Sequence, residues 1–180
     1  MALKSTIYKA DCQISDIDRG YYQSHNLTIA LHPSETEERM MARLLAFMMN
    51  AGEQLQFTKG LSTDDEPDLW QKSLTGDIEL WIDMGMPDEK RIRKAANRAD
   101  KVIVYTYGGR NNVWWSQIQP KLERFNNLAV INLPKEATDQ LTPMVKRTMQ
   151  LQISIQDGQL WVSDDQNTAT IAPEVWLNSL

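Results

Sequence analysis

The sequence has a single cysteine, Cys12, and only two histidines in 180 residues. One cysteine excludes an internal disulfide and a cysteine-based zinc site, and it favours a reducing compartment, so we expect a cytoplasmic protein. No apolar run approaches the roughly 18 residues that predict a membrane span. Residues 1–11 have neither the basic start nor the apolar core of a signal peptide. We therefore expect no membrane partner.

Glycine and proline are also scarce, with 8 and 7 copies, and the chain has no low-complexity segment or internal repeat. Without a candidate linker, we expect residues 1–180 to form a single domain. Acidic residues outnumber basic ones by 24 to 19, which gives a net charge of −5. This balance excludes a protein that coats nucleic acid with its whole surface, although local basic patches can still bind phosphate.

Hydrophobic periodicity and turn residues predict an alternation of helices and strands. Ser34, followed three residues later by Glu37, has the spacing of a capping box and predicts a helix from Glu35 to about Asn50. Strands are expected at 3–13, 21–31, 54–59, 68–74, 77–84, 101–107, 128–133 and 168–172, helices at 87–99 and 111–125 with a bend or break at Pro120, and a hairpin at 148–162. This order predicts an α/β fold with a mixed sheet flanked by helices, and an additional antiparallel β layer formed by the N- and C-terminal strands.

The dipeptide Thr75-Gly76 has the spacing of a tight hairpin turn between 68–74 and 77–84. The resulting register pairs Trp70 with Trp81, Lys72 with Glu79 and Leu69 with Ile82. These are an aromatic couple, an ion pair and an apolar couple, all of which stabilise antiparallel strands. The same register places Asp68 opposite Asp83, with Cβ atoms about 4.5–5.5 Å apart.

Two carboxylates at that distance repel each other, so either one keeps a proton, or both are exposed, or a cation lies between them. Mg²⁺ or Mn²⁺ fits such a pair, since these ions are held by one or two carboxylates together with water and substrate phosphate. Alternatively, Asp68 is a loop residue after Pro67 and Asp83 only ends the strand before Gly85.

Glu66-Pro67-Asp68, followed by Ile82-Asp83-Met84-Gly85, resembles the motif of the PD-(D/E)XK nuclease superfamily. Three longer segments, 32–39, 60–67 and 80–95, are similar to the YaeQ family, and this resemblance covers almost the whole chain. It implies a restriction-endonuclease-like core at about 34–133 around an acidic site, with N- and C-terminal β extensions. It implies no particular substrate.

Carried over to this chain, the superfamily motif assigns Asp68 and Asp83 as metal ligands. The lysine expected two positions after the second acid is replaced by Gly85, which is unfavourable for ordinary nuclease chemistry. Lys90, Arg91 and Lys94 share one helix face, and Arg91 or Lys94 can replace the lysine. The alternative is that this face is only a solvated, charged surface.

Two further positions complete the candidate site. Glu38 lies in line with the apolar stripe of its helix and is the expected third metal ligand, although it can equally be a surface charge. Lys90 and Arg110 are candidate phosphate-binding residues. Arg110 precedes Trp114 and Trp115, which either stack on bases or simply pack against the protein.

The residues therefore leave two functions open. The first is a Mg²⁺- or Mn²⁺-dependent phosphodiesterase that acts on a nucleic acid or a nucleotide, with Asp68, Asp83, Arg91 and Lys94 in catalytic roles. The second is a catalytically inactive nuclease-fold scaffold that binds nucleic acid or a protein partner.

Overall fold

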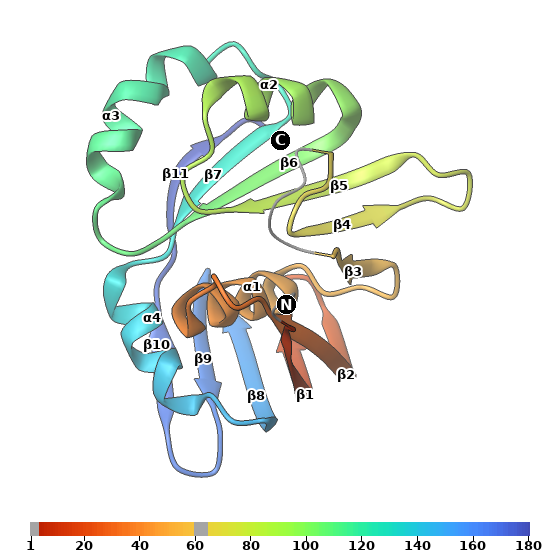
Figure 1. Cartoon of the computed structure of the whole chain (residues 1–180), viewed down its shortest axis with the longest axis vertical. Helices are drawn as coiled ribbons and strands as arrows, with labels where there is room; N and C mark the ends of the chain where they lie inside the picture. Colours follow the sequence, from red (N-terminus) through yellow and green to blue (C-terminus); the bar gives the residue numbers. More distant parts are fainter. Residues whose placement is uncertain (1–3, 60–64) are drawn as a thin grey trace. The chain divides into compact units, whose positions relative to one another are not determined.

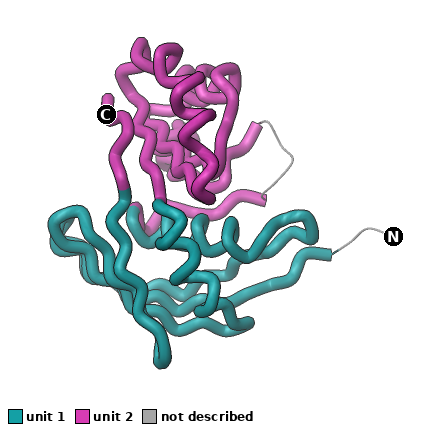
Figure 2. The backbone as a smooth tube through the Cα atoms, turned by 90° about the vertical axis from the view of Figure 1, so that its left-hand side faces the viewer, with its two compact units in different colours: residues 1–49, 134–173 teal, residues 50–133, 174–180 magenta. Residues whose placement is uncertain are grey.

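The computed structural model describes residues 4–59 and 65–180, which form two compact units (Figure 2). Unit 1 comprises residues 1–49 and 134–173, and unit 2 comprises residues 50–133 and 174–180. The first helix, which the sequence analysis grouped with the core at 34–133, belongs to unit 1. Among the described residues, no helix has the length and hydropathy needed to cross a membrane.

Unit 1 is a five-stranded sheet covered on one face by helices (Figure 1). Its elements are β1 (Thr6–Asp16), β2 (Tyr21–Leu31), α1 (Glu37–Met49), α4 (Lys135–Leu141), the 3-10 helix η1 (Thr142–Met144), β8 (Thr148–Gln156), β9 (Gln159–Ser163) and β10 (Thr168–Ile171). The strand order is β10-β9-β8-β1-β2. The strands show the alternation expected when one face is buried, for example Met149, Leu151 and Ile153 on β8.

The N- and C-terminal strands do form one layer, but the prediction that this layer is antiparallel was wrong at its centre. β1 pairs with β8 in parallel, from Lys9 opposite Thr148 to Asp16 opposite Ile155. Parallel neighbours need a long crossover connection. Here, the connection from β1 to β8 includes residues 50–133 of unit 2. A connection of this length allows the two strands to pair either in parallel or antiparallel.

Helix α1 begins later than its sequence pattern predicts. Thr36, not Ser34, accepts the hydrogen bond that caps the helix, from Arg39 N to Thr36 Oγ1 at 3.1 Å. Ser34 instead forms a hydrogen bond with the His32 ring, and Glu35 is buried in ion pairs with Arg39 and Arg43. The helix therefore starts at Glu37, with Thr36 as its cap and Glu35 before it.

Unit 2 is a six-stranded mixed sheet with the strand order β11-β7-β6-β5-β4-β3, in which β5, β6 and β7 are parallel. Its elements are β3 (Leu55–Phe57), β4 (Leu69–Lys72), β5 (Ile78–Met84), α2 (Glu89–Arg98), β6 (Ala99–Thr106), α3 (Asn111–Leu122), β7 (Leu128–Asn132) and β11 (Glu174–Asn178). Ile92 and Ala95 of α2 and Ile118 of α3 pack in one core with Trp81 and Val104 of the sheet.

Helix α3 runs through Pro120 to Leu122, so the predicted break is absent. A proline near the C-terminal end removes only one hydrogen bond of a helix that is about to stop, which limits its cost. Neither α4 nor β11 is predicted from the sequence. β11 pairs antiparallel with β7, more than forty residues away in the chain.

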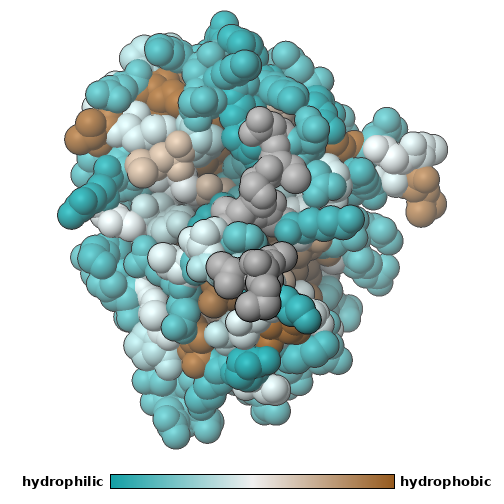
Figure 3. Space-filling model, viewed as in Figure 1, coloured by the Kyte–Doolittle hydropathy of each residue, from teal (hydrophilic) through white to brown (hydrophobic). Residues whose placement is uncertain are grey.

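The β4–β5 hairpin has the predicted register at its base, with Leu69 opposite Ile82 and Trp70 opposite Trp81. A bulge then pairs Lys72 with Ile78, so the predicted pairing of Lys72 with Glu79 was wrong. The Lys72 ammonium instead lies 3.9 Å from the centre of the Trp70 ring. The hairpin ends in a fully exposed Leu74, and a hydrophobic spot marks this projecting end in the space-filling view (Figure 3).

Candidate functional site

Asp68 and Asp83 meet at the base of the β4–β5 hairpin. The backbone N–H of Asp68 donates to Ile82 O at 3.0 Å, and Met84 N donates to Asp68 Oδ2 at 2.9 Å. The Asp68 carboxylate is therefore fixed beside the backbone of the residue that follows Asp83. Asp68 is 7% exposed and Asp83 only 2% exposed. The hairpin thus brings two buried acids to one place.

Arg91 of helix α2 binds Asp83 with two parallel hydrogen bonds. Arg91 Nε donates to Asp83 Oδ2 at 2.8 Å, and Arg91 Nη2 donates to Asp83 Oδ1 at 3.0 Å. Nη2 also donates to the backbone carbonyl of Glu66 at 3.0 Å. The start of the helix is fixed by Asp88, whose side chain accepts from Arg91 N at 2.8 Å. A bidentate guanidinium is the strongest hydrogen-bonding partner that a carboxylate finds in a protein.

Burial raises the pKa of the Asp83 carboxyl above its ordinary value of 3.8. The hydrogen bonds and the charge of Arg91 act in the opposite direction, and the charge of Asp68 adds to the rise. The indole N–H of Trp81 also lies close enough to lower this pKa, although its geometry falls short of a full hydrogen bond. Desolvation is thus the dominant influence on the acid, and Arg91 offsets part of it.

The arrangement of these side chains does not fit a divalent metal ion. Both oxygens of Asp83 already accept hydrogen bonds from a guanidinium, whose positive charge would repel a second cation. Within residues 4–59 and 65–180, no three Asp, Glu, His or Cys side chains converge to hold a metal. Glu38, the expected third ligand, lies half-buried on α1 in unit 1. Its negative charge contributes there to the raised pKa of Lys135, after the hydrogen bond from Lys135 to Asp139.

Gly85 occupies the position where the nuclease motif has a lysine. Its backbone has a φ of +100°, and its N–H donates to Tyr105 O at 2.8 Å. A Cβ at this position would meet no atom within 4 Å, so the obstacle to a side chain is the backbone conformation and not the space. A lysine at position 85 would therefore be strained in this turn.

The outer side of α2 carries a cluster of cations that we call the basic face: Lys90, Arg93, Lys94 and Arg98, with Arg124 beside them. All five side chains are exposed. Two carboxylates contact this face. Glu89 pairs with Arg93 and Arg124, and Asp65 pairs with Lys94 at 3.2 Å. Lys90 forms no ion pair or hydrogen bond with another described residue.

Comparison with known proteins identifies the family. The family model described as "YaeQ protein" matches residues 1–173. The chain is 48% identical over 177 residues to the "Uncharacterized protein YaeQ" of Escherichia coli strain K12, with 98% of each chain covered. The protein of the same name from Salmonella typhi is also 48% identical, over 98% of each chain. The chain belongs to the YaeQ family.

Solved YaeQ structures have the same fold. The crystal structure of the YaeQ protein from Xanthomonas axonopodis pv. citri is 48% identical and gives a TM-score of 0.93 over 96% of this chain and 98% of that chain. The YaeQ protein from Pseudomonas syringae, 36% identical, also gives 0.93, over 97% of each chain. The mixed α/β architecture of two mixed sheets flanked by helices is therefore that of the known YaeQ structures.

Arg110 is the other residue that the sequence predicts to bind phosphate. It directly precedes α3. Its side chain is exposed and forms no hydrogen bond with another described residue. The neighbouring tryptophans are half-buried. Trp114 Nε1 donates to Pro87 O at 3.0 Å, and the Trp115 ring lies 5.4 Å from that of Trp176. Trp114 and Trp115 thus pack against the protein in this YaeQ fold.

Sequence reasoning missed two participants in the site. The backbone carbonyl of Glu66 accepts from Arg91, and the Arg98 guanidinium lies 5.2 Å from the centre of the Trp81 ring while it donates to Asp65 O. Arg91 and Arg98 are seven residues apart, which is two helical turns, so their common face was visible in the sequence. The backbone carbonyls of Asp65 and Glu66 could not be predicted as acceptors, because every residue has a carbonyl group.

Proposed function

We propose that this YaeQ-family protein binds nucleic acid through the basic face of α2 and does not cleave it. In this proposal, the chain is similar to the PD-(D/E)XK superfamily in the order of its elements, which begins with α1 of unit 1 and continues through unit 2. A helix, three strands, a helix and a strand follow one another as α1, β3, β4, β5, α2 and β6, with Asp68 before the second strand and Asp83 in the third. The acid pair is the remnant of a metal site, now neutralised by Arg91.

The observation that carries the proposal is the bidentate ion pair between Arg91 and Asp83. In a metal-dependent nuclease, this carboxylate would bind the ion. Here a guanidinium supplies the positive charge without any cofactor, and it also binds the segment that carries Asp68 through Glu66 O. The missing lysine at position 85 supports the same conclusion, since the turn favours glycine.

Phosphate binding is supported by the charges on α2. The basic face has five exposed cations and, in the part of the chain that the structure describes, two contacting carboxylates, whereas the net charge of the whole chain is −5. Such a local excess attracts a polyanion against the overall charge of the protein. Contacts from Lys and Arg to phosphates supply most of the affinity of non-specific nucleic-acid binding.

A metal-dependent phosphodiesterase is the second candidate, favoured by the burial of two carboxylates at one place and the raised pKa of Asp83. Asp68 and Asp83 would hold Mg²⁺ or Mn²⁺, with Arg91 or Lys94 on the phosphate of a nucleic acid or a nucleotide. This function requires Arg91 to leave Asp83. In the structure, Arg91 occupies both oxygens of Asp83, so the arrangement does not fit the ion.

Fluorescence anisotropy with a labelled oligonucleotide of random sequence, in single-stranded and in duplex form, tests the proposal. We expect binding that weakens as salt rises. The triple variant K90Q/R93Q/K94Q should bind more weakly and show a shallower salt dependence, by roughly 0.7–0.9 in log–log slope for each lost phosphate contact. The matched control K4Q/K9Q/K135Q removes three exposed cations from unit 1 and should bind like the wild type, apart from a small general charge effect.

Incubation of the same oligonucleotides with Mg²⁺ or Mn²⁺ separates the two candidates. The proposal predicts no cleavage by the wild type. Metal-dependent cleavage that disappears in Asp83→Asn would overturn it in favour of the phosphodiesterase. Equal loss of binding in the triple variant and its control would show that the basic face is not the binding surface.

A further inference from the structure

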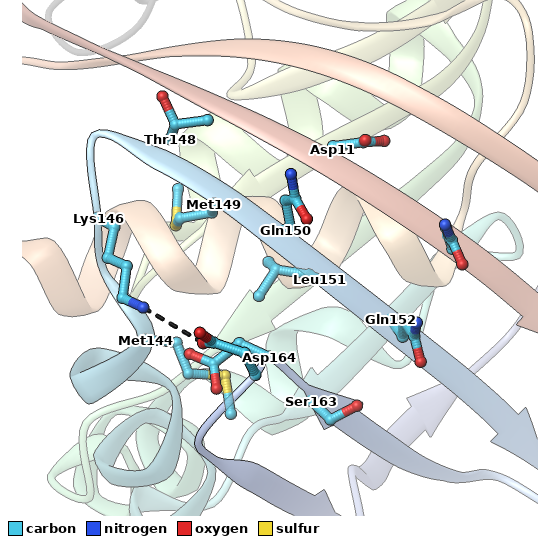
Figure 4. Close-up of a pocket in the computed structure, with 12 residues that line it drawn as sticks. Asp11, Met144, Lys146, Thr148, Met149, Gln150, Leu151, Gln152, Ser163 and Asp164 are labelled. Carbon is cyan, nitrogen blue, oxygen red and sulfur yellow. Dashed lines mark hydrogen bonds and ion pairs between the residues drawn. The ribbon is translucent and has the colours of Figure 1, made fainter.

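A cavity of about 390 Å³ lies along β8, between β1 and the end of β9 (Figure 4). Met144, Met149 and Leu151 form its apolar part. Its polar lining includes Asp11, Gln13, Gln150, Gln152 and Ser163. These side chains point to the face opposite the buried residues, because alternate strand residues face opposite sides of the sheet.

Strand pairing places these polar groups side by side. Asp11 is opposite Gln150 and Gln13 is opposite Gln152 across β1 and β8, and Gln152 is also opposite Ser163 of β9. Adjacent strands are about 4.8 Å apart. None of the five side chains forms a hydrogen bond with another described residue. The cavity thus presents amide, hydroxyl and carboxylate groups that are free to bind a ligand and are held on rigid strands.

The charge of the cavity excludes anions. Lys146 is its one cation among the lining residues and pairs with Asp165 at 3.4 Å. Three carboxylates, Asp11, Asp164 and Asp165, thus line the cavity against this one cation, whose charge also acts on Asp164. Asp164 Oδ1 accepts from two backbone N–H groups, whereas Oδ2 is shielded from solvent and accepts no hydrogen bond from a described group. A phosphate or sulfate would be repelled, and a ligand rich in hydroxyl donors would be complementary.

A second hollow, of about 500 Å³, extends the first across β2. The two share Gln13, and the second is also lined by Ser15, Tyr22 and Ser24. Tyr22 is opposite Ser15, which is followed across the sheet by Ser154 and Trp161. Tyr22 and Trp161, 58% and 37% exposed, therefore lie in one row about 14 Å apart, three strand spacings.

We propose that this polar groove, defined by the two hollows and the Tyr22–Trp161 row, binds a neutral oligosaccharide. Amide and carboxylate groups can bind neighbouring hydroxyls of a sugar by two hydrogen bonds at once. An exposed aromatic ring offers a flat apolar surface that matches the C–H face of a sugar ring. The distance between Tyr22 and Trp161 suits a chain of several sugars, and the free carboxylates exclude nucleic acid from this face.

Isothermal titration with neutral hexasaccharides of glucose, xylose and N-acetylglucosamine tests the proposal on the full-length protein. We expect at least one of them to bind. The variants Trp161→Ala and Gln152→Ala should each weaken that binding by about tenfold. Gln156→Ala is the matched control, because this residue is on the same face of β8 but lines neither hollow. Thermal unfolding confirms that each variant is folded.

Binding that survives both Trp161→Ala and Gln152→Ala, or that Gln156→Ala weakens equally, would overturn the assignment. The absence of binding by every neutral hexasaccharide would also overturn it, as would preferential binding of a sulfated hexasaccharide. These outcomes are independent of nucleic-acid binding by α2, so this proposal and the proposed function can fail separately.

Discussion

Arg91 determines the chemistry of the acid pair. Its guanidinium neutralises Asp83, which is almost completely buried, and binds the carbonyl before Pro67 at the same time. A buried carboxylate that loses its only strong partner retains the full cost of desolvation. The stability of this region therefore depends on one side chain that a nuclease motif would assign to the substrate.

Replacement of Arg91 by alanine should lower the free energy of unfolding by about 3 kcal/mol, the low end for a broken buried pair, because the Arg91 side chain is 27% exposed. Urea unfolding measures this loss. Arg93→Ala is the control, since Arg93 is 48% exposed and, among the described residues, pairs only with Glu89 on the helix surface. Its effect should stay within about 0.5 kcal/mol. Equal effects of the two substitutions would contradict the role given to Arg91.

The pKa of Asp83 gives the site a specific pH dependence. Because this pKa is raised in the folded protein, Asp83 binds its proton more tightly when folded than when unfolded. Its contribution to stability is therefore greatest below the unfolded pKa and is lost as the pH rises through the folded pKa. The stability of the wild type relative to Asp83→Asn should increase as the pH falls from neutral toward about 4. Urea unfolding of both proteins across this range checks the sign; a relative decrease would mean that Arg91 outweighs burial.

At the scale of elements, the start of α1 shows how a buried charge overrides a local motif. The capping-box pattern at Ser34 and Glu37 was a sound local signal, but Glu35 is needed between Arg39 and Arg43. The cap moves to Thr36, a residue type that is equally suited to it.

Thr36→Ala should therefore destabilise the protein by about 1 kcal/mol, the usual loss for an N-cap threonine. Ser34→Ala should change stability by less than about 0.5 kcal/mol, since Ser34 is exposed and lies outside the helix. Thermal unfolding of the two variants measures the difference. A larger loss of stability for Ser34→Ala than for Thr36→Ala would mean that Ser34 caps the helix.

The β4–β5 hairpin shows what a turn can and cannot predict. The turn at Thr75-Gly76 and the chemistry of the facing pairs predicted the register at Leu69 and Trp70 correctly. The bulge at Lys72 was not predicted, because a two-residue turn at Thr75-Gly76 implies a regular register, whereas the turn is closed by hydrogen bonds from Ser73 N to Asp77 O and from Gly76 N to Ser73 O. The strand register near Asp68 and Asp83 could be predicted from the sequence, because the pairs Leu69–Ile82 and Trp70–Trp81 determine it there.

For the whole molecule, the sequence predicted the α/β class, the order of most elements and the proximity of Asp68 and Asp83. It did not predict that Arg91 pairs with Asp83, because Arg91 reaches Asp83 only once α2 packs on the sheet through Ile92 and Ala95. It also missed the parallel pairing of β1 with β8 and the addition of β11 beside β7. Both pairings join segments far apart in the chain, so no local periodicity reports them.

In the proposed function, Arg91 supplies to Asp83 the positive charge that a metal ion would supply in a nuclease. The most direct measurement is the melting temperature of the wild type and of Arg91→Ala during titration with Mn²⁺, because a bound ion stabilises the folded state by mass action. We expect no shift for the wild type and a rise for Arg91→Ala, in which Asp83 has lost its guanidinium partner. A rise for the wild type that Asp83→Asn abolishes would contradict it.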